Sequence, residues 1–313
     1  MKYIMKSFSF IVCVFLSLSV RAEVLDEFMN KSERGRQSTE SLEDLLSYTD
    51  LDNQHIMLNS YVAASVGIIS ESVDIKYEAD WYYNSGEFDY DGELEGDLTE
   101  FSISYGKISD DSVTVYSYRF KGGEQDGELE YDFYSYSWGS SASSFSTYST
   151  QKVSEHEFRF LISKKHKPVM DKVYNQGYFS GAMIIRKEDR VDSIQGPSPI
   201  SWLGNKRELE LTHVNFICGG GYIFKKRISR FLLGARGDLD IGFGFTSADD
   251  SIDDYETDWA LYFGGNVSAF ADIDFNSVSL FLEVGSRYQS MLGQFSGNRV
   301  KSGYGRIGLR SYW

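Results

Sequence analysis

The chain has 313 residues, of which 42% are hydrophobic and 16% aromatic, and its 31 basic and 46 acidic residues give a net charge of −15. Such an acidic chain is poorly suited to nucleic acid, because binding to phosphates needs a basic surface. No segment after residue 22 approaches about 18 consecutive apolar residues, so the sequence predicts no membrane-spanning helix there.

Residues 1–22 have the pattern of an export signal. Lys2 and Lys6 give a positive start, an apolar run follows, and Ala22 precedes a cleavage point before Glu23. The run is short for a spanning helix, so we expect cleavage, with a retained membrane anchor as the alternative. Without this segment, which carries three basic residues and no acid, the net charge is −18.

Residues 23–56 are polar and contain one short amphipathic pattern. Ser41 is a favourable helix-start residue, and Leu42, Leu45 and Leu46 share one helical face. Two roles remain open for this segment, a periplasmic lead-in and a plug that enters the structure that follows.

From residue 57 onward, short segments alternate apolar with polar residues. In residues 72–83, for example, Val73 and Ile75 alternate with Asp74 and Lys76. This alternation is typical of β-strands whose two faces meet different surroundings. Twelve segments follow the pattern: 57–69, 72–83, 98–107, 112–121, 128–138, 155–163, 178–188, 207–224, 230–246, 255–271, 277–292 and 302–313.

These segments predict an all-β fold, an antiparallel up-and-down transmembrane β-barrel over residues 57–313, with twelve strands and with ten or fourteen as alternatives. An even number returns both ends of the barrel to the periplasmic side. The connections at 225–229 and 272–276 are short, as periplasmic turns should be, whereas residues 84–97 are long for one. Residues 140–149 are rich in serine and predict a flexible external loop.

The last six residues, from Gly308 to Trp313, resemble the C-terminal assembly signal of Gram-negative outer-membrane β-barrel proteins, with Gly308, Tyr312 and Trp313 as its key positions. Ser311 stands where a bulky apolar residue is common, and Trp313 replaces the commoner phenylalanine. The resemblance implies a location in the outer membrane, with its lipid and the barrel-assembly machinery as partners. The strand pattern after a short helix is also similar to autotransporter translocator domains, although no passenger segment is present.

The candidate site is the polar lining of the barrel. Alternation assigns thirteen residues of mixed charge to the lumen: Asp74, Lys76, Glu78, Asp80, Arg159, Arg236, Asp238, Asp240, Asn266, Glu283, Arg287, Arg306 and Arg310. They could line a pore that selects solutes by charge, or form salt bridges that hold a narrow barrel closed. Counting residues from the short turns places Asn266 opposite Glu283, and Glu283 between Arg236 and Arg306 as the partner of both.

Catalytic chemistry has a weaker basis in the sequence. No strand places a histidine and a serine two residues apart on one face, as an embedded hydrolase would need, and His213 is interpreted as a polar residue of the lumen or rim. No spacing of His, Cys, Asp and Glu resembles a metal site, and no cofactor is expected.

We therefore expect a passive, porin-like channel or transport protein for small solutes. The alternatives are an embedded hydrolase acting on lipid or surface polymer, and a structural or adhesion barrel with a blocked lumen.

Overall fold

The computed structural model describes residues 60–81, 86–109, 112–135, 141–164, 174–194, 206–228, 231–250, 256–275, 278–293 and 296–312. Within these residues the chain forms ten strands: β1 (Ser60–Trp81), β2 (Gly86–Ile108), β3 (Ser112–Ser135), β4 (Ser141–Lys164), β5 (Tyr174–Ile194), β6 (Lys206–Ile228), β7 (Phe231–Asp250), β8 (Glu256–Phe275), β9 (Val278–Gly293) and β10 (Ser296–Tyr312). No helix in this part of the chain is long and apolar enough to cross a membrane. The predicted signal peptide and residues 23–56 lie outside the described residues.

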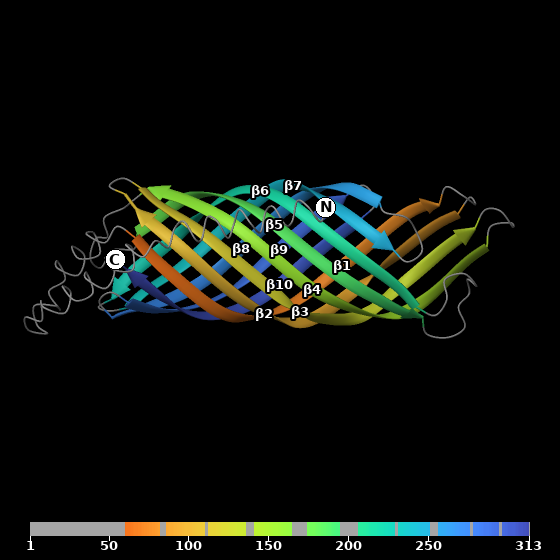
Figure 1. The fold of residues 1–313 in the computed structure, drawn as a ribbon, viewed down its shortest axis with the longest axis horizontal. Coiled ribbons are helices and arrows are strands. Elements are labelled where there is room, and N and C mark those ends of the chain that lie inside the picture. Colours follow the sequence, from red (N-terminus) through yellow and green to blue (C-terminus); the bar gives the residue numbers. More distant parts are fainter. Residues whose placement is uncertain are drawn as a thin grey trace, which may run out of the picture. The chain divides into compact units, whose positions relative to one another are not determined.

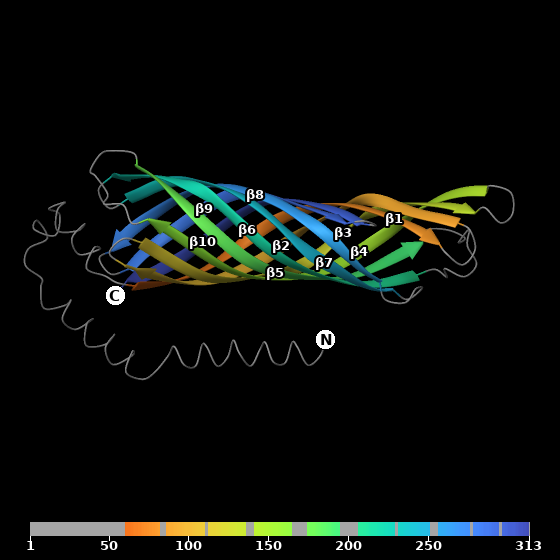
Figure 2. The ribbon, with the colours of Figure 1, turned by 90° about the horizontal axis from the view of Figure 1, so that it is seen from above.

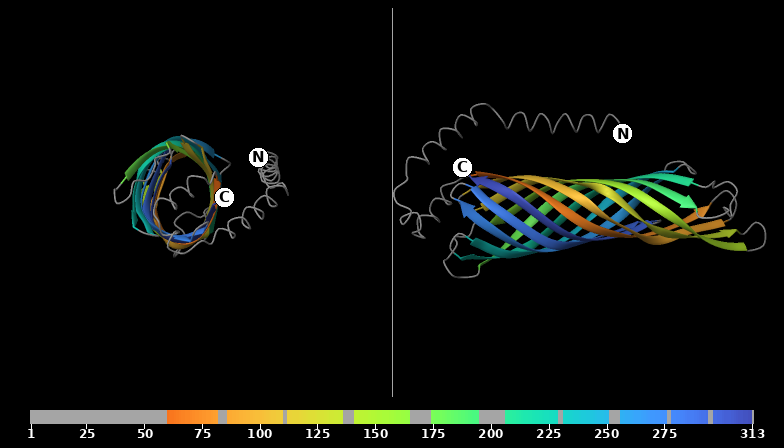
Figure 3. Two further views of the ribbon diagram at one scale, coloured as in Figure 1. Left: turned by 90° about the vertical axis from the view of Figure 1, so that its left-hand side faces the viewer. Right: turned by 90° about the horizontal axis from the view of Figure 1, so that it is seen from below.

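The ten strands close into a single antiparallel barrel. Each strand pairs with its neighbours in sequence, and β1 completes the ring by pairing with β10. Val66 of β1, for example, lies opposite Ile307 of β10 on one side and Phe101 of β2 on the other. Figure 3 shows the ring end-on, and Figure 1 shows the tilt of the strands along it. Closure leaves no strand edge unpaired, as lipid surroundings require.

The prediction of twelve strands is wrong, and the alternative of ten is the one observed. The segments 57–69 and 72–83 belong to one strand, β1, and the segments 112–121 and 128–138 belong to β3. The serine-rich stretch predicted to be a loop lies largely within β4. Most of residues 84–97, predicted to be a turn, form the first half of β2.

A change of polarity within single strands explains both errors. Near the start of β1, the outward-facing side chains are apolar: Val66 and Ile68 are 58% and 67% exposed. Beyond Ser70 the pattern reverses, so that Val73 and Ile75 point inward and are buried while the outward positions are polar. The apolar residues therefore move from even to odd numbers without a break in the strand. In a sequence, this phase shift looks like two strands.

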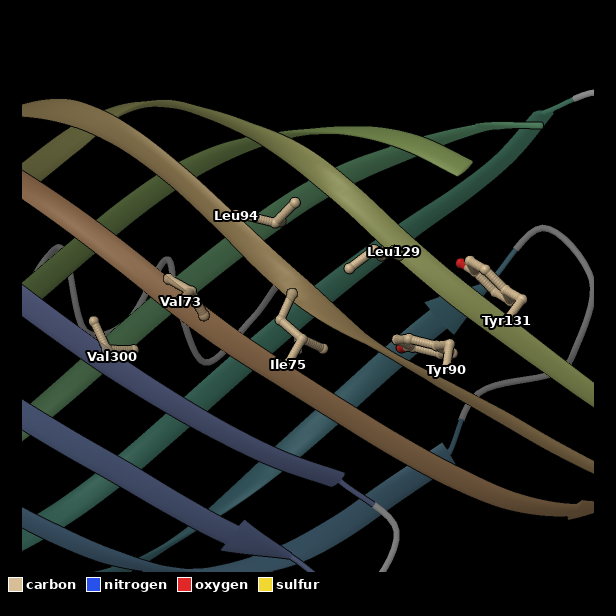
Figure 4. Packing of buried hydrophobic residues seen from close by; sticks show 7 residues of the cluster. All are labelled: Val73, Ile75, Tyr90, Leu94, Leu129, Tyr131 and Val300. Carbon is tan, nitrogen blue, oxygen red and sulfur yellow. The ribbon is translucent and has the colours of Figure 1, made fainter. Parts of the chain in front are cut away.

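The same reversal occurs in β3. Tyr116 is outward-facing and exposed, whereas Leu129 and Tyr131, farther along the strand, are buried inside. Seven inward residues form an apolar cluster in this part of the barrel: Val73, Ile75, Tyr90, Leu94, Leu129, Tyr131 and Val300. Figure 4 shows them on β1, β2, β3 and β10. Here the barrel resembles a water-soluble protein, apolar inside and polar outside.

The outer surface thus has two zones. The first, the apolar belt, consists of outward-facing hydrophobic side chains on all ten strands, among them Val66, Phe101, Tyr116, Phe160, Phe179, Phe216, Leu239, Phe263, Leu282 and Ile307. The second, the projecting half, comprises residues 70–81, 86–97, 122–135 and 141–154 of β1 to β4. Figure 2 shows the ends of β3 and β4 extending past the other strands. A belt of this kind is typical of a surface that faces lipid.

The projecting half carries an acidic ladder on the outer faces of β2 and β3. Opposed residues pair acid against acid: Asp91 with Glu130, Glu93 with Glu128, and Glu95 with Asp126. All six side chains are exposed. Like charges directly opposite one another destabilise a sheet, so this arrangement lowers stability.

Among the described residues, no group of three or more His, Cys, Asp and Glu side chains is arranged to hold a metal ion.

Candidate functional site: the barrel interior

Buried ion pairs cross the lumen where the apolar belt gives way to the projecting half. Glu71 of β1 accepts hydrogen bonds from Lys121 Nζ at 2.6 Å, Arg186 Nη1 at 2.8 Å and Gln125 Nε2 at 3.1 Å. Glu155 of β4 lies 3.0 Å from Lys121 and 3.4 Å from Arg186. The four charged side chains are at most 3% exposed. Because β1 and β5 are not neighbours, the contact between Glu71 and Arg186 spans the barrel.

The network continues along β5 to His213 of β6. Arg186 donates to Glu188, and Glu188 lies 3.6 Å from His213 Nε2. His213 Nδ1 is 2.8 Å from the hydroxyl of Thr246, and only 2% of the histidine is exposed. His213 is therefore buried inside the lumen. A large substrate would have no access to a side chain in this position.

Aromatic rings and guanidinium groups fill the lumen within the projecting half. Arg190 lies over the ring of Tyr90 at 4.7 Å, and Arg207 lies over the same ring at 5.3 Å. The hydroxyl of Tyr131 donates to Asp192, which also pairs with Arg190 at 3.1 Å. Burial raises the pKa of Tyr131 above its usual value, so this phenol stays a neutral donor.

A second apolar cluster lies in the lumen beside these ion pairs. Ile184, Ile217, Ala260, Tyr262 and Met291 come from β5, β6, β8 and β9 and are all buried. We refer to this cluster and the ion pairs around Glu71 together as the closure, because their buried side chains occupy the lumen at this level.

Below this closure lies a cavity of about 430 Å³, in the half of the barrel that carries the apolar belt. Twelve charged side chains line it. Seven are cations and five are anions: Arg119, Arg159, Lys225, Arg236, Arg287, Arg306 and Arg310, with Glu157, Asp238, Asp240, Asp272 and Glu283. The cavity is therefore locally cationic within a strongly acidic chain.

Most of these charged side chains form ion pairs. Two of the pairs join strands that are not neighbours in the barrel. Arg159 of β4 donates to both oxygens of Asp240 on β7, at 3.2 and 2.7 Å. Arg310 of β10 lies 2.9 Å from Asp272 of β8. Such bidentate and buried pairs hold both members in fixed positions.

The remaining acids are also occupied. Arg119 and Arg159 both donate to Glu157. Arg236 lies 3.0 Å from Asp238, and Arg306 lies 2.6 Å from Glu283.

Nine of the thirteen predicted lining residues lie on the wall of this cavity: Arg159, Arg236, Asp238, Asp240, Asn266, Glu283, Arg287, Arg306 and Arg310. Asp74 and Lys76 were assigned to the wrong face. Their side chains point outward, where Asp74 lies 3.0 Å from Lys301, because the phase shift in β1 turns the apolar residues inward. The side chains of Glu78 and Asp80 lie outside the described part of the chain.

The predicted register around Glu283 is partly wrong. Arg306 lies directly opposite Glu283 and pairs with it, but Asn266 lies opposite Arg287. Arg236 binds Asp238 and the hydroxyl of Tyr178, at 3.0 and 2.8 Å, in place of Glu283. Strand tilt across the barrel moved Arg236 away from the expected layer. Of the predicted assembly signal, Gly308 and Tyr312 lie in β10, and Trp313 is outside the described residues.

Sequence reasoning missed the buried charged residues whose ion pairs cross the lumen. Glu71 was placed in the gap between two expected strands, and Lys121 at the end of another. Reading residues 57–83 as one strand would have put Glu71 on the same face as Ser65, and therefore inside. The signal was the absence of glycine, proline, asparagine and aspartate from residues 69–73, so that no strong turn residue separates the two segments.

No protein-family model matches this chain, and no curated protein matches it in sequence. Solved structures do match in fold. The outer-membrane protease OmpT from Escherichia coli gives a TM-score of 0.54 at 10% identity, covering 82% of this chain and 97% of that protein. The translocator domain of the autotransporter NalP from Neisseria meningitidis gives 0.35 at 12% identity, covering 93% and 99%. Ail of Yersinia pestis gives 0.25 at 11% identity, covering 80% and 99%. With its ten strands closed into one ring, the described part of the chain has the fold of an outer-membrane β-barrel protein.

Proposed function

We propose that this protein is an integral barrel of the Gram-negative outer membrane with a closed lumen, which displays its projecting half at the cell surface in a structural or adhesion role. The observation that carries this proposal is the set of buried contacts from Glu71 to Lys121 and Arg186, which joins strands on different sides of the barrel. Separating these ion pairs would leave buried charges without their partners, which is costly in free energy. We therefore expect the pairs to stay formed in the resting barrel.

The outer surface supports the location. The apolar belt has the composition of a lipid-facing wall. The first described residue of β1, Ser60, and the last of β10, Tyr312, lie at the same end of the barrel, as they do in bacterial outer-membrane barrels. With that end in the periplasm, the polar, acidic outer wall of β1 to β4 extends beyond the bilayer into the surroundings of the cell. Its length and charge suit contact with other molecules, since side chains there are free of lipid.

A passive channel is the second candidate, and one observation favours it. The charged cavity below the closure resembles one half of a solute pathway, which would become continuous if the ion pairs around Glu71 separated. The two candidates differ in a single measurable property, the conductance of the resting barrel.

Planar-bilayer conductance of the full-length protein tests the proposal. We expect the unmodified protein to give no stable conductance steps, and Glu71→Ala to give intermittent leak, because Lys121 and Arg186 lose their shared partner. Glu208→Ala is a matched control, since it removes an exposed acid from the outer face of β6. Stable, regular steps from the unmodified protein would contradict the closed lumen and favour the channel.

A second measurement addresses display at the surface. In a Cys218→Ser background, Asp126→Cys should react with a membrane-impermeant maleimide on intact cells. Labelling only after the cells are lysed would place the projecting half on the periplasmic side and overturn the orientation.

A further inference from the structure

We propose that the cavity below the closure is a dead-end binding site for a small free anion that carries a carboxylate or phosphate group, with Arg287 as its principal ligand. The site goes beyond the proposed surface role. It can be tested in detergent, where neither membrane location nor display at the cell surface affects the result.

Charge pairing inside the cavity leaves two cations over. Each of the five acids on the wall contacts at least one arginine, through the pairs of Arg119, Arg159, Arg236, Arg306 and Arg310. Glu100, behind the wall, is shared between Arg119 and Arg306 at 3.7 and 3.5 Å. Arg287 and Lys225 make no hydrogen bond or ion pair with any described residue.

Arg287 is held in place by an aromatic ring and has no acid within ion-pair distance, although Glu157 and Glu100 act on its charge from farther away. Its guanidinium lies over the ring of Tyr304 at 5.7 Å. Tyr304 is itself fixed, because its hydroxyl donates towards Asn266 at 2.9 Å and Glu283 at 3.0 Å. A cation stacked on an immobilised ring, facing a cavity, keeps its N–H donors available for a planar or tetrahedral anion.

The position of the two cations gives the cavity a direction. Lys225 lies three residues before the end of β6, close to the rim at which the described chain begins and ends. Arg287 lies farther in, four residues beyond Glu283 along β9, next to Gln289 beneath the apolar closure. A cation near the entrance raises the local concentration of anions, and a second cation at the closed end binds them.

The size and lining of the cavity limit the ligand. Its volume of about 430 Å³ suits a small molecule, at the lower end of the usual range of roughly 300–1,000 Å³. Aromatic side chains, Tyr262, Tyr304, Phe270 and Phe281, share the wall with the charges. A molecule with one anionic group and an apolar or aromatic body matches this lining better than an inorganic ion does.

Binding of two probes to the full-length protein in detergent, measured by calorimetry, tests the site. Phenyl phosphate and benzoate share an aromatic body and differ in the anionic group, so the tighter binder identifies the preferred anion. We expect saturable binding of at least one probe with one site per chain. Arg287→Gln should weaken it by about tenfold or more, as expected for loss of a charged hydrogen bond, and Arg287→Lys by less.

Matched variants separate the site from a general effect of charge. Arg299→Gln removes a cation from the outer face of β10 and should leave binding unchanged. Circular dichroism should show that Arg287→Gln is folded in detergent when no probe is present, because Arg287 makes no hydrogen bond or ion pair with the described residues, so weaker binding by this variant reports on the site.

Three results would overturn the site. They are the absence of saturable binding of either probe, equal affinity of Arg287→Gln and the unmodified protein, and competition by dextran sulfate. That polymer is too large to enter the cavity, so competition would move the binding to the outside of the barrel.

Discussion

Glu283 of β9 and Arg306 of β10 lie directly opposite one another and are joined by two hydrogen bonds, of 3.1 and 2.6 Å, to one carboxylate oxygen. The other oxygen of Glu283 accepts from the hydroxyl of Tyr304 at 3.0 Å. The carboxylate therefore fixes both β10 side chains that face the cavity at this level.

Loss of this carboxylate should destabilise the barrel. Glu283→Ala leaves the partly buried Arg306 with Glu100, at 3.5 Å, as its remaining partner, so we expect a cost below about 3 kcal/mol, the cost that follows when a buried charge loses its only partner. We expect a lower unfolding temperature in detergent, measured by circular dichroism. Arg306→Ala added to Glu283→Ala should cost less than the sum of the single changes, because the two residues share one interaction.

Arg236 provides the control for that pairing. Since Arg236 binds Asp238 and Tyr178, Arg236→Ala added to Glu283→Ala should be closer to additive than the Arg306 combination. Stronger coupling of Glu283 to Arg236 than to Arg306 would contradict the observed register.

How far the sequence predicts this fold depends on which zone a residue occupies. Within the apolar belt, alternation gives the correct face for residues such as Arg159, Asp240 and Arg306, because lipid demands apolar side chains on every outward position. In the projecting half the same strand reverses its pattern, as expected where water replaces lipid. Asp74 and Lys76 were misassigned there because alternation defines two faces and does not say which one is inside.

Which charged residues form ion pairs is harder to predict than which of them point into the lumen. Arg159 and Asp240 meet across the lumen from β4 and β7, and Glu71 meets Arg186 from β1 and β5. Such contacts depend on strand number and on stagger around the ring, neither of which is local to a segment. The prediction of twelve strands would have placed different walls opposite one another, so these partners lay beyond what the pattern could supply.

Reversing one charge in the acidic ladder should stabilise the barrel. Glu128 of β3 faces Glu93 of β2, so Glu128→Lys replaces a repulsive pair with an attractive one and should stabilise the barrel by about 0.5–1 kcal/mol. The gain should shrink at high salt, where exposed charges are screened. Thermal unfolding at low and high salt checks both expectations.

Glu208→Lys is the comparison for this change. It makes the same change in net charge on the exposed face of β6, but Glu208 already lies 2.6 Å from Lys206, whose hydrogen bond and charge hold the pKa of Glu208 below its usual value. Reversal there should bring no gain. Equal stabilisation by both substitutions would show that total charge matters and that the ladder does not.

The apolar belt can be tested through the cysteine that it contains. Cys218 is exposed on the outer face of β6, between the outward-facing Phe216 and Tyr222. In lipid nanodiscs, we expect Cys218 to react slowly with a water-soluble maleimide and to react fully after unfolding in detergent and urea. Asp126→Cys in a Cys218→Ser background should react at once in the same nanodiscs. Fast labelling of Cys218 in lipid would show that this face of β6 meets water.

Two glycines of β10 give a final test, at the seam where the ring closes. A side chain added at Gly308, which faces inward, would collide with the backbone oxygen of Ala64 on β1 and with the ring of Phe281 on β9. Gly303 faces outward on the same strand, and an added side chain there meets nothing within 4 Å. Gly308→Ala should therefore lower stability by about 1–3 kcal/mol, as overpacking does, while Gly303→Ala should be neutral or slightly stabilising.

The same pair of variants separates packing from recognition by the assembly machinery. If Gly308 matters through the collision with Ala64 and Phe281, Gly308→Ala will also refold poorly in detergent, where no machinery is present, and its folded fraction on unheated gels will fall. If Gly308 acts only as part of a C-terminal signal, the variant will refold normally in detergent and fail only in cells. The close approach of three strands at this glycine leads us to expect the first result, because no rearrangement of Phe281 alone would free the backbone of β1.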